Sequence, residues 1–167
     1  MTGAWQFVSE SANEVPSSNV LSVAYDPTRG RLFALDISDT SIGKNLRRAR
    51  LLQFDLGERT SRVLLTWPYV PVADAHFIIA TGSGDLLLVL GKKNVFKTYR
   101  LGIEASGVKW RGLHVTQGSL LGPPMMGEFE PNVAYLRKGK GKGKGEVVEY
   151  LELSPSLFKG HEKCGAL

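Results

Sequence analysis

The sequence has one cysteine, three histidines and no long apolar stretch. Cys164 has no second cysteine to pair with, so packing alone, without an intramolecular disulfide, must hold the fold. The longest apolar run, DLLLVLG at 85–91, has the length of a strand and falls far short of the roughly 18 residues of a transmembrane helix. The first ten residues, MTGAWQFVSE, have neither the basic start nor the apolar core of a signal peptide, which favours the cytoplasm.

Residue patterns that carry catalysis or bind metals are also missing. His76 and His114 have no serine or cysteine near them in a recognisable nucleophile setting. The stretch TGSGD at 81–85 is not followed by a helical pattern and lacks the lysine of a phosphate-binding loop. His161 and Cys164 have a chelating spacing, but no second Cys/His pair lies nearby. We therefore expect neither a catalytic residue nor a bound metal or cofactor.

Short apolar segments that alternate with polar residues dominate the chain. NVLSVAY at 19–25 reads as a strand, and RLFALDI at 31–37 reads as the strand that returns from it. Between them, DPTRG at 26–30 has the chemistry of a tight turn, because proline presets φ and glycine accepts a positive φ. In the returning strand, Phe33 and its alternate neighbours Leu35 and Ile37 point to one face. The pattern predicts an all-β protein of antiparallel strands.

The predicted strands group into units of roughly 50 residues, the range of a four-stranded propeller blade. The first unit covers about 19–67 and the second about 75–111, each with four strands; the third, about 113–153, has three. Residues 4–9, AWQFVS, form a spare strand that we expect to close the third unit, and 154–167 is a tail. All of this belongs to one domain over 1–167.

GRLFALDIS followed by RLLQFDLGERTSRVLLT resembles the generic β-propeller repeat of the YVTN and related families. The resemblance implies an architecture and carries no functional residue. Propellers close with typically four to eight blades. Three units therefore imply an incomplete ring: a fragment of a larger protein, several copies completing a ring, or sheets that stack without closing. The same alternation is also compatible with an antiparallel β-sandwich or barrel of about ten strands.

The net charge of +5 is concentrated in one place. RKGKGKGKG at 137–145 holds five basic residues and no acidic one, so the other 16 of the 21 basic residues balance the 16 acidic residues. Alternating lysine and glycine cannot form a helix or a core, which predicts a cationic connection between two strands. Such a run attracts polyanions (nucleic acid, anionic lipid headgroups or acidic glycans), although solvated charge runs often serve only solubility.

In a four-stranded meander, every connection between the second and third strands emerges at the same end of the sheet. All three such connections are basic here, which predicts a basic loop face that contacts a polyanion. The candidate residues are Arg47, Arg48, Lys92, Lys93, Arg137, Lys138, Lys140, Lys142 and Lys144.

These features favour a non-enzymatic binding or interaction module. Its expected partners are a polyanion, another protein, or a second copy joined through blade edges. The alternative is a fragment or subunit of a larger propeller enzyme whose central funnel gathers groups such as His76, Asp74 and Asp85. The loop LGPPMMGEFEP at 121–131 is expected to pack over the core as a plug rather than to form a contact patch.

Overall fold

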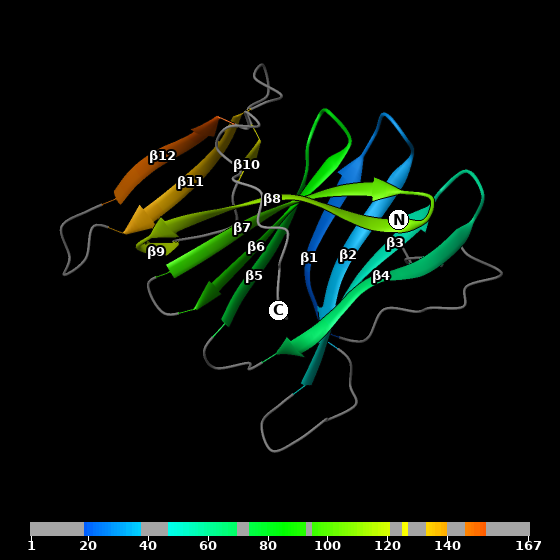
Figure 1. Ribbon diagram of the computed structural model, residues 1–167, viewed down its shortest axis with the longest axis horizontal. Helices are drawn as coiled ribbons and strands as arrows, with labels where there is room; N and C mark the ends of the chain where they lie inside the picture. Colours follow the sequence, from blue (N-terminus) through cyan, green and yellow to red (C-terminus); the bar gives the residue numbers. More distant parts are fainter. Residues whose placement is uncertain are drawn as a thin grey trace, which may run out of the picture.

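The protein is all-β, as the alternating pattern predicts. The computed structural model describes residues 19–37, 47–69, 74–92, 95–120, 125–126, 133–139 and 146–152, and within these ranges it contains strands and turns but no helix. The strands form three open sheets, and none of the sheets closes into a barrel within the described ranges. Figure 1 shows the sheets following one another across the molecule, the first on the right, the second in the centre and the third on the left. Residues 4–9 and 154–167 lie outside the described ranges.

The first sheet is an antiparallel meander in the order β1-β2-β3-β4. Its strands are β1 (Asn19–Asp26), β2 (Arg31–Ile37), β3 (Arg47–Asp55) and β4 (Thr60–Tyr69). The predicted turn at 26–30 forms between β1 and β2: Asp26 Oδ1 accepts a hydrogen bond from the backbone N–H of Thr28 at 3.1 Å, and Gly30 has a φ of 58°. The first unit predicted from the sequence is therefore present strand by strand.

The second sheet repeats the meander in the order β5-β6-β7-β8. Its strands are β5 (Asp74–Ala80), β6 (Asp85–Lys92), β7 (Val95–Glu104) and β8 (Gly107–Gln117). The boundary predicted between the second unit at 111 and the third at 113 does not separate two strands, because β8 runs through it. Arg100 pairs with Gly112 and Leu101 with Trp110, so Arg111 is the extra residue of a β-bulge and Gly112 lies in a bulge rather than a break.

The third sheet contains four strands, one more than predicted. They are β9 (Ser119–Leu120), β10 (Met125–Met126), β11 (Val133–Gly139) and β12 (Glu146–Glu152). β9 and β10 pair with different parts of β11, and β12 pairs with its other side. Only Gly118, with a φ of 119°, separates β8 from β9, so one nearly continuous ribbon leaves the second sheet and joins the third (Figure 1).

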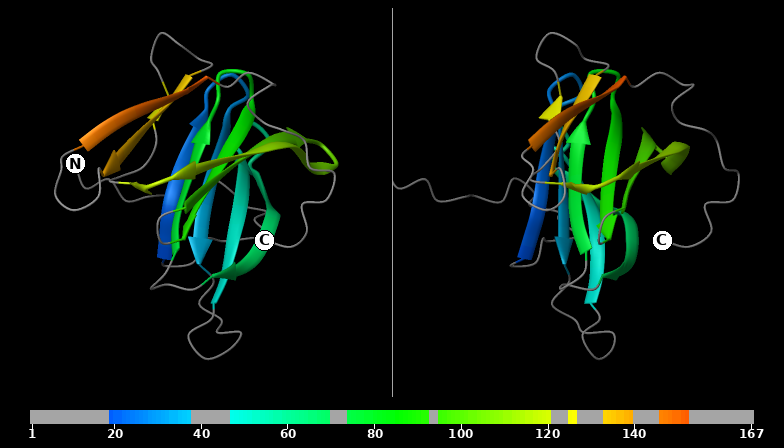
Figure 2. Two further views of the ribbon diagram at one scale, coloured as in Figure 1. Left: turned by 60° about the vertical axis from the view of Figure 1, so that its left-hand side comes forward. Right: turned by 90° about the vertical axis from the view of Figure 1, so that its left-hand side faces the viewer.

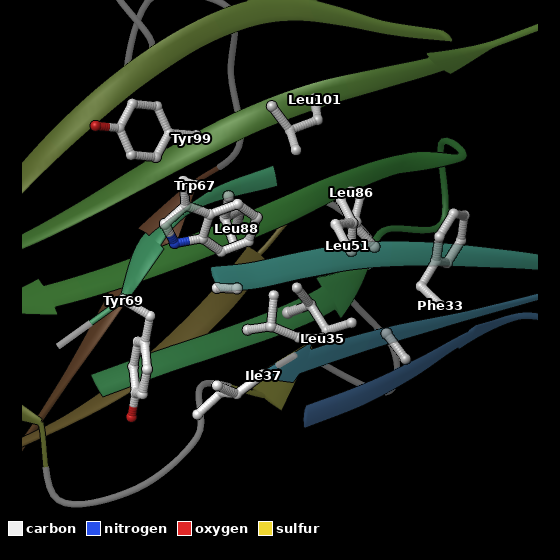
Figure 3. Packing of buried hydrophobic residues seen from close by; sticks show 13 residues of the cluster. Phe33, Leu35, Ile37, Leu51, Trp67, Tyr69, Leu86, Leu88, Tyr99 and Leu101 are labelled. Carbon is white, nitrogen blue, oxygen red and sulfur yellow. The ribbon is translucent and has the colours of Figure 1, made fainter. Parts of the chain in front are cut away.

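The main core lies between the first two sheets. Phe33, Leu35 and Ile37 of β2 share one face, as the alternation predicts, and belong to this core together with Leu86 and Leu88 of β6 (Figure 3). Leu51 of β3 and Leu101 of β7 are fully buried in the same layer. The intervening residues of the first sheet face away and form a smaller cluster around Ala34, Leu52 and Phe54. Figure 2 shows the two sheets lying against each other along their length.

Candidate functional site

The tight turns of the first two sheets lie side by side (Figure 1). Arg29, in the β1–β2 turn, donates from Nη2 to the carbonyl oxygen of Ser83 in the β5–β6 turn at 3.4 Å. Arg62, near the start of β4, donates to the carbonyl oxygens of Glu104 at 2.8 Å and Ala105 at 2.6 Å in the β7–β8 turn. The two meanders are therefore aligned, with all four tight turns at one end, which we name the tight-turn end.

The connections between second and third strands consequently emerge at the opposite end, the connection end. In the second sheet Lys92 pairs with Val95 and Val95 with Gln117, so the end of β6, the start of β7 and the end of β8 lie at the same end of the sheet. β9 then carries the chain onto the third sheet, where Ser119 pairs with Gly139 at the end of β11. This series of pairings links the end of β6 to the end of β11, where the lysine–glycine run begins, through β7, β8 and β9. In Figure 1, β3 begins at the bottom, and β6 and β11 end towards the left.

The structure describes five members of the predicted basic set, each at or near a strand end that borders one of these connections. They are Arg47 and Arg48 at the start of β3, Lys92 at the end of β6, and Arg137 and Lys138 near the end of β11. Lys93, Lys140, Lys142 and Lys144 lie outside the described ranges. Two acidic residues stand at this end as well: Asp74 opposite Lys92, and Glu146 opposite Gly139. Among the described members of the set whose side chains are placed, Arg47 and Arg48 of β3 and Arg137 of β11 are exposed.

Arg47 and Arg48 differ from the arginines in the interior of the sheets. Both are exposed, and neither forms an ion pair with any residue in the described ranges. In contrast, Arg50 pairs with buried Asp36 at 2.8 Å and Arg100 pairs with Asp85 at 2.6 Å. The inner arginines neutralise carboxylates of their own sheet, whereas the pair at the start of β3 presents its charge to solvent.

The acidic residues that the sequence places at strand ends have structural roles. Asp26 is buried and accepts hydrogen bonds from Thr28 and from Arg31, the latter at 2.9 Å. Burial by itself raises the pKa of the Asp26 carboxyl, but these hydrogen bonds and the charges of Arg31 and Arg29 outweigh burial and hold the pKa below its usual range. Asp26 is therefore a charged anchor of the β1–β2 turn.

His76 belongs to an aromatic cluster in the core. Trp67 Nε1 donates to His76 Nε2 at 3.2 Å, and the ring of Tyr69 meets the imidazole edge-on at 4.8 Å between centroids. An indole N–H can only donate, so Nε2 of His76 must be unprotonated in this arrangement. His76 stands opposite Leu90, and Asp85 lies five residues earlier on β6, about 16 Å away along the strand. His76 and Asp85, two of the three groups named for a funnel site, therefore lie apart within the second sheet.

Two surface cavities lie elsewhere. One, of about 510 Å³, opens at the tight-turn end between the β3–β4 turn and the β7–β8 turn, and Arg31, Arg62 and Glu104 are among its lining residues. The other is a groove of about 680 Å³ between β1 and β5, with Met125 and Met126 of β10 beside it. The sequence reasoning missed the groove. Its one available signal is NVLSVAY at 19–25, which has apolar residues on both faces of a single strand.

Comparison with known proteins assigns no function to these features. No family model, curated protein or solved structure matches the chain. Among the described residues, no group of histidine, cysteine and acidic side chains has the arrangement of a metal site. The same residues include no helix that is long and apolar enough to cross a membrane.

Proposed function

We propose that this protein is a non-enzymatic interaction module that binds a polyanion at its connection end. The observation that supports the proposal is the alignment of the first two sheets by Arg29 and Arg62, because the start of β3 and the end of β6 then lie at the same end of the two sheets. The pairing of β9 with β11 supports the same position for the third connection. Arg47 and Arg48 are exposed there, and charges that face water attract phosphate or sulfate groups without first breaking an internal ion pair.

The test uses a fluorescent oligothymidylate as the probe and follows its anisotropy over a series of salt concentrations. Two variants remove connection-end charge: R47S/R48S, and K138S/K140S/K142S/K144S. For single-stranded DNA, each lysine or arginine that contacts a phosphate contributes about 0.7 to the slope of log K against log salt concentration. Both variants should therefore bind more weakly and with a shallower slope.

The matched control is R59S/K109S, which removes two exposed positive charges at or near the tight-turn end. It changes the net charge as much as R47S/R48S does. Binding driven only by overall charge would weaken equally in both double variants, and that result would refute a site at the connection end. Heparin and anionic vesicles as further probes distinguish a glycan or lipid surface from nucleic acid.

A second proposal concerns how the sheets assemble into a larger structure, and the arrangement of the first two sheets supports it. The first two sheets have the same strand order and pack face to face with their tight turns aligned, which is how neighbouring blades of a β-propeller are arranged. We propose that the sheets are blades of an incomplete ring, completed by further chain or by other copies. Sedimentation velocity of the chain at high concentration tests completion by copies, and a strictly monomeric protein would exclude it.

A further inference from the structure

The exposed large apolar side chains of the described residues gather on the first and third sheets, at the two ends of the row of sheets in Figure 1. Their exposed fractions run from 44% to 68%, and Val115 of the second sheet is the one member outside these two sheets. Single apolar residues scattered over a surface are normal, whereas clusters mark contact sites. The first cluster is Val20, Val23 and Tyr25 of β1, and the second is Met125, Val148 and Tyr150 of β10 and β12.

The cluster on β1 lies on the face of the first sheet that is turned away from the second. Its members stand opposite the residues of β2 that alternate with Phe33, Leu35 and Ile37 of the core, in the pairs Val20–Asp36, Val23–Ala34 and Tyr25–Leu32. Residues directly opposite each other in an antiparallel ladder share a face. The smaller apolar cluster of the first sheet, which contains Leu32 and Ala34, therefore belongs to the same face. We name this surface the outer face of the first sheet.

The second cluster also shares one face. Met125 and Tyr150 both pair with residue 135, and Val148 precedes Tyr150 by the strand period of two. The exposed fractions of Met125, Val148 and Tyr150 are 55%, 57% and 68%, so this face of the third sheet is open to solvent. We name it the outer face of the third sheet. The chain thus presents an open apolar face on the first sheet and another on the third, with the second sheet between them (Figure 1).

One strand of each sheet lines the groove of about 680 Å³. These strands are β1 and β5, which are the first strands of their meanders, and β10, which is an edge strand of the third sheet. A β-propeller arranges its blades around a central channel, with one edge of each blade towards that channel. The groove has the position that the channel of such a ring would occupy.

We propose that a second copy of this chain completes the ring, with the outer face of the first sheet of each copy packed on the outer face of the third sheet of the other. This inference rests on the incomplete ring proposed above. Propellers close with typically four to eight blades. Two copies of three sheets supply six blades, whereas one copy falls below that range and three copies exceed it.

The proposed packing covers both apolar faces. A two-fold axis along the channel makes the two contacts identical, and the ring closes with neither outer face left exposed. A dimer that joined like faces, first sheet to first sheet, would leave the outer face of the third sheet in water. The contact would also have the chemistry of the core between the first two sheets, where apolar side chains of facing strands pack together.

The test is sedimentation velocity of the full chain and of two charge variants. V23K/Y25K changes the outer face of the first sheet, and V148E/Y150E changes that of the third. Each contact of the ring joins one face of each kind, so either variant alone disrupts both contacts and should weaken dimerisation by about tenfold or more. An equimolar mixture of the two variants should form a heterodimer, because one contact keeps its native faces and the other joins lysines to glutamates.

The matched control is V115K, which changes an exposed apolar side chain on neither outer face and should dimerise as the wild type does. V23T/Y25S and V148T/Y150S repeat the dimerisation test of each face if circular dichroism shows that a charge variant is unfolded. A variant that dimerises alone while the other does not would assign the contact to like faces and overturn the proposal, as would two folded charge variants that do not associate when mixed.

The remaining outcomes separate this inference from the proposals on which it rests. A wild type that stays monomeric at high concentration excludes completion by copies altogether. A wild-type dimer that neither charge variant weakens refutes these two faces but keeps completion by copies. Oligothymidylate binding by a monomeric wild type would leave the polyanion site standing, so its failure is distinguishable from failure of the ring.

Discussion

The guanidinium group of Arg29 occupies the space that a side chain on Gly84 would need. A Cβ on Gly84 would collide with Nη1, Cζ and Nη2 of Arg29, and the φ of Gly84 is 83°, in the left-handed region. Arg29 belongs to the β1–β2 turn and Gly84 to the β5–β6 turn, so a side chain at position 84 would displace Arg29 from its contact with Ser83 between the two turns.

Replacing Gly84 with alanine should therefore destabilise the protein. We expect a loss of about 1–3 kcal/mol in the free energy of unfolding, from the left-handed backbone and from displacement of Arg29, measured by urea denaturation. G30A is the control, because Gly30 also has a positive φ but a Cβ there meets nothing within 4 Å. The double variant R29A/G84A should lose less than the sum of its single changes. A G84A loss no larger than that of G30A would show that Arg29 plays no part.

Acidification should weaken the fold through Asp26. The pKa of this carboxyl is lowered in the folded protein, so its stabilising contribution is complete above the ordinary value of about 3.9 and disappears as the pH falls through the lower folded value. D26N leaves the nearly buried Arg31 without its carboxylate and should cost about 3 kcal/mol at neutral pH. In urea denaturation at several pH values, the stability gap between wild type and D26N should narrow below about pH 4. A gap that stays constant down to pH 2 would contradict this assignment.

Removing the imidazole acceptor should destabilise the aromatic cluster. H76L keeps an apolar side chain of similar size but leaves the indole N–H of Trp67 buried without its present acceptor, a loss of about 1–3 kcal/mol. In W67F the donor is absent, so H76L should cost less in that background. A double-mutant cycle in urea measures the difference, and additive effects would mean that the hydrogen bond contributes nothing to stability.

Arg62 should hold the β7–β8 turn against the first sheet. R62K keeps the charge but cannot reproduce the forked contact with the carbonyl oxygens of Glu104 and Ala105 and with Gln53 Oε1. Because the site is exposed, we expect a global loss below about 1 kcal/mol. Backbone amides around residues 104–107 should exchange hydrogen several-fold faster, with unchanged exchange in β6. K109R, an exposed change on β8, is the matched control.

Most of the first two sheets could be predicted from local chemistry. DPTRG at 26–30 and GSG at 82–84 combine a residue that presets or caps a turn with a glycine that accepts a positive φ, and both form tight turns. Strand alternation correctly placed Phe33, Leu35 and Ile37 on one face of β2, and the structure shows that this face is turned to the core. These features depend on neighbours within a few positions, which a sequence displays directly.

What the sequence could not reveal depends on contacts between distant segments. β10 is two residues long within a proline-rich loop, too short to show a period, and it forms because β11 offers an edge. Met125 is 55% exposed, so the expectation that the loop packs as a plug is wrong for this residue. The groove forms where β1, β5 and β10 come together, and the local sequence of these strands does not predict that they do. The predicted polyanion site stays a prediction, since its lysines at 140, 142 and 144 lie outside the described ranges.

The ribbon that runs from β8 through Gly118 into β9 ties the position of the third sheet to that of the second. Gly139 pairs with Ser119, and only Gly118 separates Ser119 from the outer strand of the second meander, so the place of β11 is set by β8. Mechanically, a pull on the third sheet is transmitted to the hydrogen bonds between β7 and β8, which resist it jointly in shear rather than opening one at a time.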